Sequence, residues 1–135
     1  MRPTDLDRLK REAERAVDAL APELLRISHD IHSHPELAFE EHHAQALLVE
    51  ALRKARLEVE AGAYGLETAF AADFGAGAGA RVAVLAEYDA LPDIGHACGH
   101  NLIATAAPRA GLALARLGDS RPGRARPRGT PAEER

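Results

Sequence analysis

The chain has 135 residues, of which 17 are basic and 21 acidic, and its net charge is −4 with histidine neutral. This length allows one domain at most, and the acidic balance indicates no affinity for nucleic acid. The single cysteine excludes an internal disulfide framework, and no apolar run is long enough to cross a membrane. The first 17 residues lack the apolar stretch of a secretory signal, so we expect a cytoplasmic protein.

Two helices are predicted in the first part of the chain. Apolar residues recur at helical spacing over about residues 5–32, and Pro22 either kinks this helix or begins a second one. A further helix over about residues 40–55 places Leu48 and Leu52 on one face. Between them, "HSHPELAF" leaves the helical conformation because Pro35 disfavours it in the preceding residue.

Three strands and a third helix follow. "LEVEA" at 57–61 alternates like a short strand, and "TAFAADF" at 68–74 does the same. The stretch "GAGAGA" lacks the spacing of a phosphate-binding loop and precedes a strand, so it is read as a connection. The apolar run within residues 81–87 predicts a strand buried on both faces. A helix is expected over about residues 98–117.

The tail, residues 118–135, is polar and carries three prolines, so it is expected to be poorly ordered. Its segment "RARPRG" fits a central strand badly because of its proline and arginines: Arg124, Arg126, Pro127 and Arg128. The whole order predicts an α/β fold in which helices pack against a sheet. In such sheets ligands bind at the carboxyl ends of the strands, and the strand at 81–87 leads into the most reactive segment of the chain.

That segment is "DIGHACGHN" at 93–101, which contains His96, Cys98 and His100. A thiolate and an imidazole both bind zinc, manganese or cobalt. The alternative is a buried free cysteine beside surface histidines, and the spacing alone leaves both interpretations open. Asp89, at the end of the preceding strand, either orients a metal-bound histidine or is an ordinary turn residue.

Two further groups of polar residues stand out. Glu133 and Glu134 form an adjacent pair that either divides metal binding and proton transfer or is a solvated charged tail. Five histidines resemble a metal-binding tract, but no carboxylate–histidine spacing is evident among them. We expect most of them to be exposed, with His32 and His34 at the edge of a site; the five are His29, His32, His34, His42 and His43.

Together these segments resemble the M20 family of metallopeptidases and amidohydrolases, in its aminoacylase-like, aminobenzoyl-glutamate hydrolase-like and dipeptidase-like subgroup. Four blocks occur in the family order between about residues 24 and 134: "IHSHPELAFEE", "LAEYDALPDIGHACGHN", "NLIATAA" and "GTPAEE". The resemblance implies a partial α/β/α catalytic domain of the zinc-peptidase type. It also implies two divalent metal ions (zinc, manganese or cobalt) that share a water, and an amide substrate such as an N-acyl amino acid, aminobenzoyl-glutamate or a dipeptide.

The resemblance assigns roles to five residues. Cys98 and His100 would bind metal, and Glu134 would be a ligand beside them. Glu133 would be the general base, and Asp89 would orient the site from behind. His96 is expected to support the loop.

Members of this family are longer and continue with two more histidine ligands and a lid or dimerisation domain, and homodimers are expected for the full-length protein. We therefore interpret residues 1–135 as an N-terminal part of the catalytic domain that is inactive alone. Two alternatives remain: a non-catalytic chain that binds a metal or a parent subunit, and a plain globular domain with an accidental motif.

Overall fold

The computed structural model describes residues 3–75, 79–118 and 123–135. Its elements are, in chain order, α1 (Pro3–Ser33), α2 (His42–Lys54), β1 (Val59–Ala61), the short 3-10 helix η1 (Ala63–Gly65), β2 (Phe70–Ala72), β3 (Arg81–Ala86), α3 (His100–Arg116) and β4 (Arg124–Gly129). The predicted α/β class is confirmed. Residues 76–78 of the glycine-rich connection and 119–122 of the tail lie outside the described residues. None of the described helices combines the length and the apolar character that a membrane span requires.

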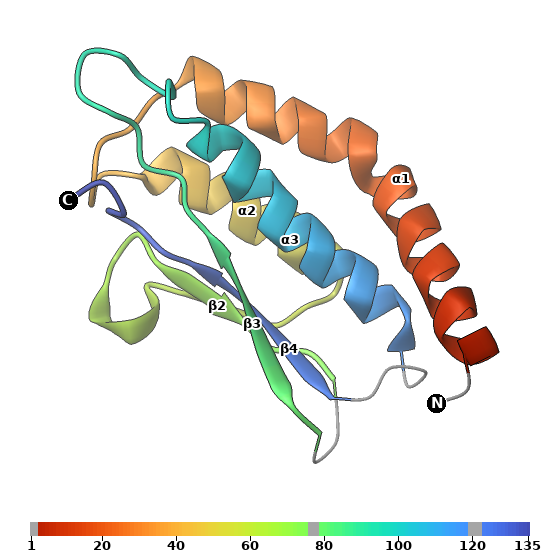
Figure 1. Cartoon of the computed structure of the whole chain (residues 1–135). Coiled ribbons are helices and arrows are strands. Elements are labelled where there is room, and N and C mark those ends of the chain that lie inside the picture. Colours follow the sequence, from red (N-terminus) through yellow and green to blue (C-terminus); the bar gives the residue numbers. More distant parts are fainter. Residues whose placement is uncertain (1–2, 76–78, 119–122) are drawn as a thin grey trace.

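The strands form one sheet in the order β1-β2-β4-β3. The β1–β2 and β2–β4 pairs are antiparallel, whereas β3 and β4 are parallel and are connected through α3. Figure 1 shows the helices on one side of this sheet, with α2 and α3 against the strands and α1 packed on α3. The apolar core lies between these layers and includes Ile27, Ile31, Leu48, Leu52 and Phe70.

Helix α1 is continuous through Pro22, so of the two alternatives left open there, a second helix start is excluded. The interior proline is tolerated because α1 is held from outside by tertiary contacts. Arg109 of α3 donates two hydrogen bonds to the Val17 carbonyl, from Nε at 3.1 Å and from Nη2 at 2.9 Å. These bonds tie the middle of α1 to α3 close to the proline.

Strand β4 corrects the prediction of a poorly ordered tail. The segment "RARPRG" alternates, so that Ala125, Pro127 and Gly129 are buried while the arginines between them are more exposed. Pro127 is tolerated in this strand because its missing backbone N–H removes a hydrogen-bond donor from only one of the two edges. The Arg124 N–H donates to Ala80 beside β3, and the Ala125 N–H donates to Phe74 on the other edge. Backbone N–H groups alternate between edges, so the position without N–H faces β2, whose ladder is short, and pairing with β3 is intact.

Strand β3 corrects a second prediction, because it is not buried on both faces. It lies at the end of the sheet, and the side chains of Val82 and Leu85 are 56% and 50% exposed. Within the described residues, helices cover only one face of the sheet. The apolar run therefore predicted the strand but overstated how many of its faces are covered.

Candidate metal centre

The carboxyl ends of β3 and β4 place the predicted site residues together. Glu87 and Asp89 follow β3, Glu133 and Glu134 follow β4, and His100 begins α3. Since β3 and β4 are parallel neighbours, both segments leave the sheet at the same edge. The α3 helix approaches β4 closely at Gly111, where a Cβ atom would lie 2.6 Å from Pro127 Cγ.

Asp89 is fully buried and connects two of the predicted ligands. Its Oδ1 lies 2.9 Å from Nδ1 of His100, and its Oδ2 accepts a hydrogen bond of 2.9 Å from the Glu134 backbone N–H. The Asp89 carbonyl oxygen also lies 2.9 Å from the same imidazole nitrogen. Two acceptors at Nδ1 favour the tautomer in which this nitrogen carries the proton, so the lone pair of His100 is on Nε2.

That Nε2 atom faces three carboxylates. It lies 3.6 Å from Glu87 Oε2, 3.6 Å from Glu133 Oε2 and 3.7 Å from Glu134 Oε1. A nitrogen lone pair surrounded by negative oxygens is electrostatically unfavourable unless a cation or protons lie between them. The His100 side chain is only 5% exposed, so water has little access to the imidazole, although it reaches the carboxylates.

The donor atoms fit a divalent transition metal. Ligand atoms of Cys98, His100 and Glu134 all lie within 4.8 Å of one another, and the same holds for Glu87, His100 and Glu133. Sulfur, imidazole nitrogen and carboxylate oxygen are the donors that zinc, cobalt and related ions accept. His100 belongs to both groups, and its single free nitrogen, Nε2, can bind one ion. The structure thus brings together all five residues that the sequence singled out, while their individual roles stay predictions.

Glu87 was missed by the sequence analysis. It was read only as the end of a strand, whereas its carboxylate faces His100. The signal that would have found it is the spacing of "EYD". Glu87 and Asp89 stand two residues apart after β3, and both contact His100, one at Nε2 and the other at Nδ1.

A second buried carboxylate fixes the segment that carries Glu133. Glu41 is fully buried, and it accepts hydrogen bonds of 2.8 Å from the Thr68 hydroxyl and from the Ala132 backbone N–H. Tyr88 is buried beside them and donates to the Thr68 carbonyl at 2.5 Å. Burial, with the nearby Glu41 and Asp89 charges, raises the pKa of Tyr88 far above its ordinary value, so this phenol stays a donor.

His96 is buried and belongs to the loop that connects β3 to α3. The residue is 6% exposed, and within the described residues neither ring nitrogen has a hydrogen-bond partner. Burial lowers the pKa of His96, so the ring is neutral near pH 7. Its ring centroid is 6.4 Å from that of His32. The expected position of His32 at the edge of the site stays a prediction.

Several proteins with known names are similar to this sequence. No family model matches the chain. It is 42% identical over 146 residues to the Xaa-Arg dipeptidase of Mus musculus, with 96% of this chain and 33% of that protein covered. The human Xaa-Arg dipeptidase is 38% identical, with 97% and 34% covered. A p-aminobenzoyl-glutamate hydrolase polypeptide of Escherichia coli K12 is 34% identical, with 73% and 24% covered.

Solved structures that resemble this chain belong to the same group of hydrolases and peptidases. A Staphylococcus aureus protein described as an aminohydrolase superposes with a TM-score of 0.80 at 25% identity, covering 93% of this chain and 36% of that chain. A Bacillus subtilis dinuclear metal-binding peptidase of the M20 family superposes with a TM-score of 0.77 at 26% identity, covering 87% and 36%. The fold and the clustered donors are those of a candidate divalent-metal centre. The chain is related to the M20 family, and it spans about a third of the length of the relatives it matches.

Proposed function

We propose that this chain supplies the first half of the metal centre of an M20-type amide hydrolase. The observation that carries the proposal is the position of His100, whose Nδ1 is engaged by Asp89 while its Nε2 faces the carboxylates of Glu87, Glu133 and Glu134. Cys98, His100 and Glu134 would hold metal, either zinc, manganese or cobalt. When bound, a pair of such ions would polarise both the attacking water and the amide carbonyl.

The residues of this chain have separable tasks in that reaction. The Glu133 carboxylate accepts the proton of the attacking water and delivers it to the departing amine. Its side chain is 48% exposed, which leaves it open to a substrate. Asp89 holds the proton on His100 Nδ1 and fixes the Glu134 backbone. Glu41 holds Ala132, and therefore the backbone next to Glu133.

The substrate is a small amide. The dipeptidase and aminobenzoyl-glutamate hydrolase relatives support an N-acyl amino acid, an aminobenzoyl-glutamate-type amide or a dipeptide. The donors described above are too few to enclose two metal ions and a substrate together, so we expect residues 1–135 alone to bind metal without appreciable turnover. A non-catalytic chain that binds metal or another subunit is the second candidate, and it predicts the same metal binding.

The test uses the purified 135-residue chain loaded with zinc, manganese or cobalt. Hydrolysis of dipeptides and N-acyl amino acids is measured beside Glu133→Gln, with the exposed Glu60→Gln as a matched control. Metal binding that is lost in Cys98→Ala, without turnover, is the expected result. Turnover that Glu133→Gln abolishes would show that self-association completes the centre. No metal binding at all would contradict the proposal.

A further inference from the structure

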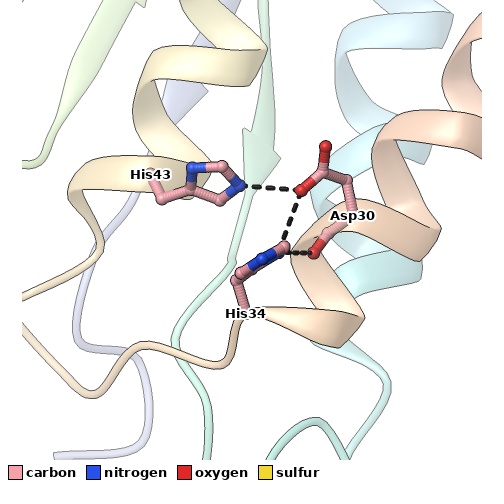
Figure 2. Close-up of side chains that lie close together, drawn as sticks. All are labelled: Asp30, His34 and His43. Carbon is pink, nitrogen blue, oxygen red and sulfur yellow. Dashed lines mark hydrogen bonds and ion pairs between the residues drawn. The ribbon is translucent and has the colours of Figure 1, made fainter.

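A second cluster of metal-binding side chains lies at the corner between α1 and α2. Asp30 comes from the last turns of α1, His34 follows the end of that helix, and His43 stands in the first turn of α2. Figure 2 shows the three side chains pointing toward one another. Their ligand atoms all lie within 4.8 Å of one another, and none of them belongs to the centre around His100.

We infer that Asp30, His34 and His43 form a second site for a divalent transition metal such as zinc. Asp30 Oδ1 lies 2.8 Å from His43 Nε2 and 3.0 Å from His34 Nδ1. Two ligands of a tetrahedral zinc ion at bond lengths of about 2.0 Å are roughly 3.3 Å apart. The two Asp30–imidazole pairs therefore have to open by only a few tenths of an ångström to admit the ion.

The side chains have the freedom to make this adjustment. Those of Asp30, His43 and His34 are 29%, 41% and 62% exposed. The other oxygen of Asp30 lies 3.8 Å from Arg26 Nη1, so Oδ1 is the oxygen that faces both rings. The ring centroids of His34 and His43 are 4.8 Å apart, and the exposure of both side chains lets solvent reach the cluster.

The backbone that carries His43 is fixed independently of the cluster. Glu36 accepts hydrogen bonds from the backbone N–H groups of His43, at 2.8 Å, and of Ala44, at 2.9 Å. A carboxylate at these free N–H groups stabilises the start of α2. One imidazole is thus presented from a rigid helix terminus toward the end of α1, and the site needs no large rearrangement.

Metal binding at this corner has a defined proton requirement. His34 Nδ1 also lies 2.9 Å from the Asp30 carbonyl oxygen, and a ring proton on Nδ1 satisfies that contact. To bind metal, neutral His34 moves this proton to Nε2. Neutral His43, whose Nε2–H donates to Asp30 Oδ1 at 2.8 Å, moves its proton to Nδ1. Tautomer exchange in each ring is therefore sufficient, and no proton is lost from the neutral rings on binding.

The site would have a structural role. The Glu36 carbonyl accepts a hydrogen bond of 2.8 Å from the Ala90 N–H, so the segment between the two helices contacts the residue that follows Asp89. An ion that joins α1 to α2 would hold the segment on which this loop rests. The donors are two imidazoles and one carboxylate without sulfur, which distinguishes this site from the one containing Cys98.

The experiment titrates zinc into the 135-residue chain carrying Cys98→Ser, which weakens the first centre. Imidazole resonances are followed by NMR, and zinc stoichiometry is measured by calorimetry. His43→Gln and His34→Gln are the test variants. His42→Gln is the matched control, because His42 is the exposed neighbour of His43 outside the cluster.

We expect the His34 and His43 resonances to shift together at zinc concentrations that leave His42 unchanged. Either test variant should weaken this binding by at least about tenfold, and His42→Gln should leave it intact. Magnesium in excess should not compete, because imidazole donors suit softer ions. The inference is overturned if both test variants bind as many zinc ions with unchanged affinity, or if all surface histidines shift in parallel.

Discussion

Asp89→Asn tests how the candidate centre is assembled. An asparagine keeps the size of the side chain but offers one acceptor and one donor in place of two acceptors. If the amide oxygen faces the Glu134 N–H, the amide nitrogen faces His100 Nδ1 and drives the ring proton to Nε2. If the amide is reversed, its nitrogen faces the Glu134 N–H and displaces that ligand. Either orientation damages one ligand while leaving the other in place.

The magnitude follows from this geometry. A carboxylate that orients a metal-bound histidine typically contributes a factor of about 10 to 100 in metal affinity, which corresponds to about 1.4–2.7 kcal/mol. Since Asp89 is fully buried, solvent cannot replace the lost acceptor, and the upper half of this range is expected. The assay is a competition titration with zinc or cobalt, monitored beside Asp93→Asn, which makes the same change at an exposed position of the same loop.

An Asp89→Asn chain that binds zinc as tightly as the unmodified chain would refute this reasoning, provided that circular dichroism shows both to be folded. NMR of the His100 ring gives an independent check. The unmodified chain should carry its ring proton on Nδ1, and the variant should show a changed tautomer or a shifted Glu134 amide resonance.

Three further predictions concern stability and ionisation. Glu41→Gln should destabilise the chain by about 1–3 kcal/mol in urea unfolding, because a buried carboxylate that accepts two hydrogen bonds becomes an amide with one acceptor. Leu48→Ala should cost about 2–5 kcal/mol through the cavity it leaves, whereas Leu102→Ala, at a side chain 60% exposed, should cost far less. The hydrogen bond from His43 holds the pKa of Asp30 below its ordinary value of 3.8, so the stability that Asp30 adds should be present above about pH 4 and vanish as pH falls through its folded-state pKa. An NMR titration should show that His43→Gln raises this pKa, and an unchanged value would contradict the assignment.

Local patterns in the sequence predicted most elements because each satisfies its own periodicity. The helical spacing of apolar residues and the alternation of short strands are decided within a few neighbouring residues. Strand β4 was not predicted from the sequence because its inward positions are filled by Ala125, Pro127 and Gly129. These residues give no strong signal for a strand. The segment forms a strand because it packs closely beneath Gly111 and pairs with β3, and both are tertiary contacts.

The two clusters of site residues also differ in how far each could be predicted from the sequence. The motif around Cys98 and His100 is compact in sequence, so its residues could be named from the sequence and the family resemblance. The Asp30 cluster was dismissed for want of a carboxylate–histidine spacing, yet Asp30 and His34 stand four residues apart at the end of α1. The third member, His43, is contributed by another helix, and only the turn between α1 and α2 brings it to Asp30.

The most direct test of the central claim is a cobalt titration of the 135-residue chain followed by absorption spectroscopy. A thiolate bound to cobalt produces a charge-transfer band, and Cys98 is the only cysteine, so this band reports the candidate centre alone. The account predicts a saturable band that disappears in Cys98→Ser, weakens in Asp89→Asn and is unaffected by His43→Gln. A chain that binds cobalt without a thiolate band, or gives the same band in Asp89→Asn at unchanged affinity, would contradict it.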